Sequence, residues 1–217
     1  MNRKHEAAAT PRVEELLASL HACAIEAGEG HLKLARLFER LGDSSFGFIL
    51  FIHTLPFLQP LSLGPISTAA GASMMALGGQ MIQGREIPWL PERINNLNLH
   101  GKFWRILITT AEKALQVGRR MTRPRLSGLV HGRRARRLAG FIIAASGLLL
   151  AVPLAGVPFS NTLPALAVLL VCLGELEEDG LMVLLALVML GMTVAYFALL
   201  GWLVYTLGDQ AWDWFKR

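Results

Sequence analysis

The sequence predicts an all-α integral membrane protein with two duplicated Pro-broken helix hairpins, a C-terminal transmembrane helix and amphipathic N-terminal helices. Hydrophobic residues make up 53% of the 217 residues and charged residues only 17%, against about 25% charged in a typical soluble domain. Asp, Glu, Lys and Arg are absent from residues 44–84, 138–174 and 180–208. Because a transmembrane helix needs about 20 apolar residues, these three charge-free blocks dominate the predicted fold.

An internal duplication connects the first two blocks. At an offset of 93 residues the chain repeats nine of the 26 positions from 47 to 72, beginning with Gly47-Phe48-Ile49 and Gly140-Phe141-Ile142. The other identical pairs are Leu55 and Leu148, Pro60 and Pro153, Leu61 and Leu154, Pro65 and Pro158, Ser67 and Ser160, and Ala72 and Ala165. Duplicated apolar segments that are broken by proline are typical of membrane transporters.

Residues 1–43 form the predicted N-terminal region. Apolar residues at helical spacing predict two amphipathic helices within residues 12–41, separated by Gly28-Glu29-Gly30. Their polar faces carry both signs of charge, so we expect them to lie on the membrane or against a partner helix. The polar start of the chain shows no cleavable signal peptide.

Residues 44–84 form the predicted first hairpin. Its two arms, about 46–58 and 66–82, are short for full crossings, and Pro60 and Pro65 would break a continuous helix between them. Two forms fit, a re-entrant hairpin and a tight pair of barely sufficient spans. Because irregular backbone at membrane depth must be covered by protein or line a water-filled cavity, either form predicts a cavity near residues 60–67.

The connector between the hairpins, residues 85–137, is strongly basic. It holds 13 Lys or Arg against three acids, which predicts a cytoplasmic location by the positive-inside rule. We expect it to contact anionic membrane lipids. It has no aromatic interleaving or recognition motif, so nucleic acid is not an expected partner.

The remaining chain comprises the second hairpin, residues 138–180, and a C-terminal segment, residues 181–217. The apolar run from Leu181 to Leu207 is the clearest transmembrane helix. Trp202 and Tyr205 near its end suit an interfacial aromatic belt.

No motif of enzymatic chemistry is present in the sequence. It lacks G-x-S-x-G, P-loop, H-E-x-x-H and paired-cysteine patterns, so we expect neither an enzyme nor a metal or cofactor site. His53 is alone within an apolar arm. It is either a packed residue that hydrogen-bonds between helices or a proton or ligand site, and the packing role is the favoured interpretation.

Two groups of residues are candidates for a solute pathway. Glu175, Glu178 and Asp179 follow the second apolar block; they are either a solvated turn or carboxylates that bind a proton, a cation or a cationic solute. The second group occupies the two proline turns, where broken helices can expose backbone groups to a solute and Ser or Asn can act as helix N-caps. This turn group comprises Pro60, Pro65, Ser67, Pro153, Pro158, Ser160 and Asn161.

Several motifs resemble the ExoD family of exopolysaccharide synthesis proteins. The most specific is Gly84-Arg85-x-x-Pro88-Trp89-Leu90-Pro91, preceded by Gln80-Met81. The N-terminal half also carries Leu41-Gly42-Asp43, Phe46-Gly47, Leu55-Pro56, Pro60 and Gly64-Pro65-x-Ser67, and the second half carries Leu173-Gly174 with Glu178-Asp179-Gly180. The resemblance covers about residues 30–207 and implies a multi-pass protein of the bacterial inner (plasma) membrane, linked to exopolysaccharide production.

Together these features predict a transporter or channel for a small, cationic solute or ion. The alternative is a non-transporting accessory protein that organises exopolysaccharide synthesis or export. One copy offers little protein to cover two broken hairpins, so we expect a homo-oligomer, most simply a dimer.

Overall fold

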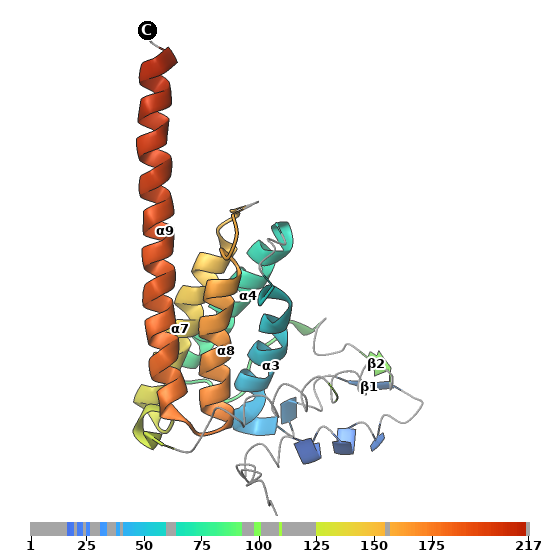
Figure 1. The fold of residues 1–217 in the computed structure, drawn as a ribbon. Coiled ribbons are helices and arrows are strands. Elements are labelled where there is room, and N and C mark those ends of the chain that lie inside the picture. Colours follow the sequence, from blue (N-terminus) through green and yellow to red (C-terminus); the bar gives the residue numbers. More distant parts are fainter. Residues whose placement is uncertain are drawn as a thin grey trace, which may run out of the picture.

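The computed structural model describes residues 17–19, 21–23, 25–26, 31–33, 38–39, 41–59, 64–92, 98–100, 109, 125–154 and 157–215. Five α-helices dominate this part of the chain (Figure 1). They are α3 (Ser45–Thr54), α4 (Pro65–Ile82), α7 (Arg133–Ala151), α8 (Thr162–Leu176) and α9 (Gly180–Phe215). Short 3-10 turns lie at η1 (Gly42–Ser44), η2 (Leu55–Phe57) and η3 (Ser127–Leu129).

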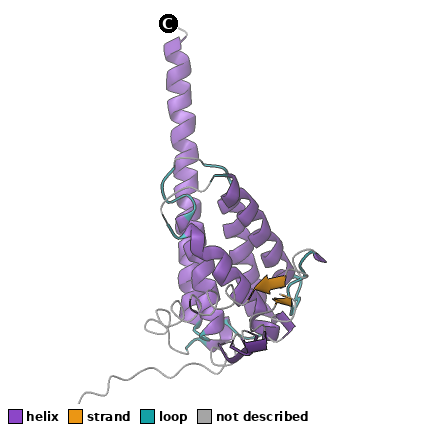
Figure 2. Cartoon of the chain, turned by 90° about the vertical axis from the view of Figure 1, so that its right-hand side faces the viewer, coloured by secondary structure: helices purple, strands orange, loops and turns teal. Residues whose placement is uncertain are grey.

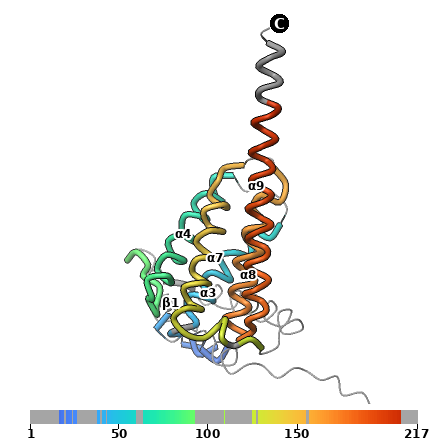
Figure 3. The backbone as a smooth tube through the Cα atoms, turned by 90° about the vertical axis from the view of Figure 1, so that its left-hand side faces the viewer, coloured from blue at the N-terminus to red at the C-terminus, as the bar shows by residue number. Residues whose placement is uncertain are grey.

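Helices α3, α4, α7 and α8 form a bundle of two hairpins whose turns lie at the same end (Figures 1 and 3). We call this end apical; the opposite, basal end holds the starts of α3 and α7 and the ends of α4 and α8. Between the hairpins, α4 packs on α7 and α3 packs on α8, and α8 also contacts α7 within its own hairpin and α9 outside the bundle. The 93-residue offset relates α3 to α7 and α4 to α8, but the duplication itself stays a prediction.

Glycines allow α4 and α7 to approach closely. Gly71 of α4 lies against Gly147 of α7, and Gly78 lies against Gly140. A Cβ atom on Gly78 would lie 2.6 Å from the Gly140 carbonyl oxygen, and one on Gly140 would lie 2.7 Å from the Gly78 carbonyl oxygen. Because the two backbones are in contact at both crossings, even alanine would force them apart.

The core of the bundle is apolar and closely packed. Leu50 of α3, Met74 of α4 and Ile142 of α7 have no exposed surface. The largest fully buried side chains are Phe46, Phe51, Leu50, Met74, Met81, Ile142 and Ile143. These residues fill the space between the four helices, so burial of apolar surface stabilises the hairpins mainly through each other.

Helix α9 packs on α8 and then continues alone beyond the apical turns (Figures 1 and 2). Its lower half buries Met182, Val183, Ala186, Leu190 and Thr193 against the bundle. The last contact is at Tyr196, whose hydroxyl donates to the Pro158 carbonyl oxygen at 2.6 Å. The apolar stretch ends only at Leu207, 11 residues or about 16 Å further along the helix axis.

Among the described residues, Gly180–Leu207 is the one helix long and apolar enough to span a membrane, with 22% of its most apolar window buried. The predicted C-terminal span is therefore present as a helix. The arms α3, with 10 residues, and α8, with 15, fall short of the length of a span. Whether the hairpins are re-entrant stays a prediction.

The boundaries and the N-terminal region differ from expectation in two places. Helix α7 begins at Arg133, within the predicted connector, so four of its first five residues are arginines. Residues His31–Lys33 form β1, which pairs antiparallel with β2 (Asn98–His100), where a helix was predicted (Figure 2). The partner strand comes from the connector, which periodicity within residues 12–41 could not reveal. Most of residues 1–40 and 93–124 lie outside the described residues.

Candidate functional site

A polar cavity of about 300 Å³ opens at the basal end, between the two hairpins. The start of α3, the start of α7 and the end of α8 contribute lining residues, and the segment that follows α4 adds Gly84 and Glu86. Its charged lining residues are Glu86, Arg133, Arg136 and Glu175, with His131 beside them. The remaining lining residues are Ser44, Gly47, Gly84, Val130, Gly132 and Leu176. The site therefore collects charged residues that lie close to the ends of the two charge-free blocks.

Glu175 reaches the cavity from the last turn of α8. Its Oε2 would lie 3.5 Å from a Cβ atom on Gly47 of α3, so the missing side chain at Gly47 leaves room for the carboxylate. One turn earlier, Cys172 is fully buried in the core. Glu175 thus stands at the boundary between the dry core and the polar cavity.

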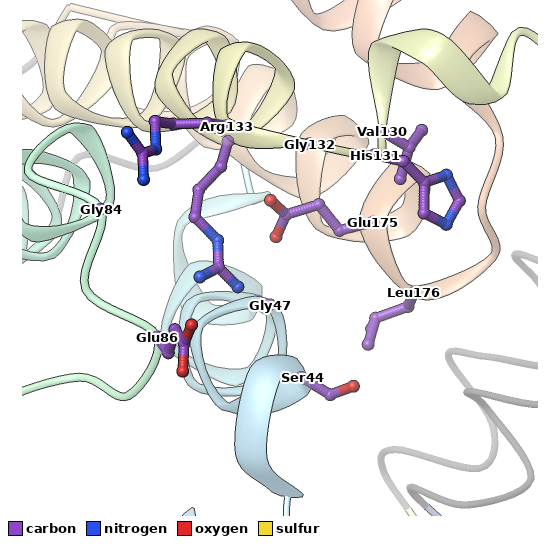
Figure 4. Close-up of a pocket in the computed structure, with 11 residues that line it drawn as sticks. Ser44, Gly47, Gly84, Glu86, Val130, His131, Gly132, Arg133, Glu175 and Leu176 are labelled. Atoms are coloured by element: carbon purple, nitrogen blue, oxygen red, sulfur yellow. The ribbon is translucent and has the colours of Figure 1, made fainter.

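Arg133 extends from the first turn of α7 across the cavity. In Figure 4 its side chain lies between Glu175 on one side and Glu86 on the other. None of the ion pairs between described residues includes Arg133. Arg136, on the same helix, donates from Nη1 to the Arg85 carbonyl oxygen at 3.4 Å and so ties α7 to the end of α4.

Asp179, which the sequence predicts as a pathway residue, lies at the start of α9 and caps that helix. It is fully buried, and its Oδ1 accepts from the Leu181 backbone N–H at 3.0 Å in the first turn of α9. The same oxygen lies 3.3 Å from Arg125 Nε, and the Arg125 carbonyl oxygen accepts from the Gly180 N–H at 2.8 Å. Asp179 therefore fastens the end of the connector to the start of α9.

The neighbouring acids lie in the turn between α8 and α9. Glu178 adopts a left-handed backbone conformation, with φ at 55°, and its Oε1 lies 3.4 Å from His131 Nε2. Glu177, which sequence reasoning did not single out, is buried, with 4% exposure. Neither Glu178 nor Asp179 lines the cavity, so the structure separates the predicted acidic group into Glu175 and a structural turn.

The proline turns lie at the opposite, apical end, and none of their described residues lines the basal cavity. Pro65 begins α4 and is exposed, as are Pro153 and Pro158; Pro60 lies outside the described residues. The Thr162 hydroxyl donates to the Gln59 carbonyl oxygen at 2.8 Å and joins the two turns.

The expected helix caps are absent from the two described apical starts. Asn161 holds the N-cap position of α8 and is buried, but its side chain makes no capping hydrogen bond. Ser67 and Ser160 are also buried; Ser67 donates to the Gly64 carbonyl oxygen at 2.6 Å and Ser160 to that of Val157 at 2.9 Å. Neither serine holds an N-cap position, because that position belongs to Gly64 in α4 and to Asn161 in α8.

His53 joins the two arms of the first hairpin. Its Nε2 lies 2.8 Å from the Ser73 hydroxyl, and that hydroxyl donates to the Ala70 carbonyl oxygen at 2.7 Å. The ring also meets Phe57 edge-on at 6.3 Å between centroids. This geometry matches a hydrogen-bonding residue between packed helices, and His53 lies outside the cavity.

The segment after α4 folds back onto its own helix. Gly84, with φ at +85°, ends α4, with Arg85 N–H bonded to the Gln80 carbonyl oxygen and Gly84 N–H to that of Met81. The Gln80 side-chain amide makes two hydrogen bonds to the backbone of Trp89. Its Nε2 donates to the Trp89 carbonyl oxygen at 3.1 Å, and its Oε1 accepts from the Trp89 N–H at 2.6 Å. These bonds fix the segment after α4 and so position Glu86 at the cavity.

Sequence reasoning missed Glu86, Arg133 and Arg136 as site residues. Glu86 lies two residues after the first charge-free block, Arg133 and Arg136 lie within five residues before the second, and Glu175 follows the second block directly. Charges that border apolar runs were therefore a usable signal. Which of them converge depended on α4 packing against α7 and α3 against α8, which the sequence does not contain.

Comparison with known proteins places the chain in a family. The profile for exopolysaccharide synthesis, ExoD, matches residues 16–199. Protein ExoD of Rhizobium meliloti is 36% identical over 180 residues, covering 82% of this chain and 74% of the relative. An uncharacterized protein of Synechocystis sp. is 24% identical over 150 residues, covering 69% of each chain. No solved structure matches significantly. The chain belongs to the ExoD family, which is linked to exopolysaccharide synthesis.

Proposed function

We propose that this ExoD-family chain is a multi-pass protein of the bacterial inner membrane that binds a small cation, inorganic or organic, in the basal cavity and moves it across the bilayer. The observation that carries the proposal is the placement of two carboxylates around one cavity: Glu86, just after the first hairpin, and Glu175, at the end of α8 in the second hairpin. Carboxylates that border apolar transmembrane segments typically serve protons or cations.

The cavity has a size and a position that suit a solute. Its volume of about 300 Å³ is at the lower end of the range for small-molecule sites. Above it, Leu50, Ile142 and Ile143 are fully buried, so the described core closes the apical side. Transport would then require the helices to move. This conformation would be the one in which the cavity is open at the basal end.

Binding can be tested on purified protein in mild detergent. We expect a cation of suitable size to raise the midpoint of thermal unfolding, because a ligand that binds only the folded state stabilises it. Sodium, potassium, magnesium and small organic amines are the probes. Glu175→Gln should remove this shift, whereas Glu92→Gln, at an exposed acid outside the cavity, should retain it. An equal shift in Glu175→Gln would refute the site.

The accessory role is the second candidate, and α9 favours it. Beyond Tyr196 the helix leaves the bundle and presents large apolar side chains, with Trp202 and Tyr205 exposed by 63% and 69%. This surface suits another transmembrane helix as well as lipid. Crosslinking from Trp202→Cys in cells should capture a synthesis or export protein if the role is that of a scaffold. Capture of a second copy would instead support the predicted homodimer.

A further inference from the structure

The geometry points to Arg133 as a built-in counter-ion that occupies the acidic part of the basal cavity, so that a cationic solute must displace it. This inference rests on the proposed function and concerns how the same site is regulated. Arg133 lines the cavity together with Glu86 and Glu175, and its side chain lies between the two acids in Figure 4. A guanidinium at this position holds the place that a cation would take.

The Arg133 side chain can move out of the cavity because none of the ion pairs between described residues includes it. It is also exposed to solvent. Arg136, by contrast, is partly buried and bonded to the Arg85 carbonyl oxygen. A long, solvent-accessible side chain can exchange between the cavity and water at a small free-energy cost, because exposed ion pairs contribute little.

The helix dipoles of α7 and α8 disfavour the charges of Arg133 and Glu175. Arg133 is in the first turn of α7, where the helix dipole disfavours a cation, and Glu175 is in the last turn of α8, where it disfavours an anion. Neither helix end favours the charge that it carries, and none of the ion pairs between described residues joins Arg133 to Glu86 or Glu175. Arg133 therefore acts on the carboxylates through the longer-range attraction of opposite charges. Removing Arg133 takes this attraction away, so a soluble cation gains affinity.

The alternative is that Arg133 binds the anionic part of a solute directly. The two roles predict opposite signs, because loss of a counter-ion strengthens binding whereas loss of a ligand-binding group weakens it. Arg134, on the same turn of α7, is exposed but does not line the cavity. Arg134→Gln is therefore the matched control for loss of one positive charge at this end of the molecule.

The test measures cation affinity in wild-type protein, Arg133→Gln and Arg134→Gln by calorimetric titration, using the cation that stabilises the wild type most. We expect Arg133→Gln to lower Kd by about two- to fivefold, the size of effect that weak interactions between exposed charges produce, and Arg134→Gln to leave Kd unchanged. A higher or unchanged Kd in Arg133→Gln would overturn the inference.

Failure of the inference is distinguishable from failure of the proposed function. If the wild type binds a cation through Glu175 but Arg133→Gln binds no better, only the counter-ion role is lost. If neither the wild type nor Arg133→Gln binds any of the cations, both are lost. Far-ultraviolet circular dichroism of each variant establishes that a changed Kd does not arise from misfolding.

Discussion

At the residue scale, three acids at the end of α8 and in the turn after it have different positions. Glu175 lines the cavity, Glu178 lies beside His131, and Asp179 caps α9 and pairs with Arg125. Residues that follow one another in the sequence thus divide between a candidate binding site and the connection of two helices. The sequence alone could identify the cluster but not this division, since it depends on where α8 ends.

Asp179→Ala should reduce stability without changing cation binding. The substitution removes a helix cap and leaves Arg125 without its carboxylate, at a cost of about 0.5–2 kcal/mol for the cap alone. The measurement is the free energy of unfolding in detergent, beside the Kd for the cation. Asp179→Asn, which retains an oxygen acceptor, should recover part of the lost stability. A large loss of cation affinity in either folded variant would indicate that Asp179 belongs to the binding site.

At the element scale, glycine spacing determines how the hairpins meet. The apolar helices and both hairpins were predictable, because charge-free runs and proline breaks are local properties of the sequence. The pairing of α4 with α7 was not, because it depends on Gly71 and Gly78 meeting Gly147 and Gly140 across 60 or more residues of chain. Small residues mark a possible contact, but they do not identify its partner.

Gly78→Ala should destabilise the bundle more than Gly79→Ala. A Cβ atom at Gly78 would lie 2.6 Å from backbone atoms of α7, whereas one at Gly79 would have no atom within 4 Å. Overpacking of this kind costs about 1–3 kcal/mol. Thermal unfolding of the two variants measures the difference, and equal midpoints would contradict the close crossing of α4 and α7.

At the scale of the whole molecule, the extension of α9 bears on the predicted topology of the hairpins. Pro158 is level with Tyr196, and the apolar stretch continues for about 16 Å beyond that contact. If the bilayer covers this stretch and the basic basal end is cytoplasmic, the apical turns lie inside the bilayer and both hairpins enter and leave on the cytoplasmic side. We therefore predict the re-entrant form of the two that the sequence left open.

Cysteine labelling of intact cells tests this topology. Val152→Cys in the apical turn and Gly128→Cys at the basal end should both resist a membrane-impermeant thiol reagent, whereas Leu207→Cys should react; Cys23→Ser and Cys172→Ser provide a background without native thiols. Strong labelling of Val152→Cys would indicate that the hairpins are full spans. Strong labelling of Gly128→Cys would contradict the cytoplasmic assignment of the basal end.

Transport of a cation through the basal cavity is tested by its flux into proteoliposomes. Purified wild-type protein should carry the cation that it binds, and Glu175→Gln should reduce the initial rate to that of protein-free liposomes. Glu92→Gln, reconstituted to the same density, should match the wild type. Wild-type flux no higher than that of protein-free liposomes, or unchanged flux in Glu175→Gln, would contradict cation transport that depends on Glu175.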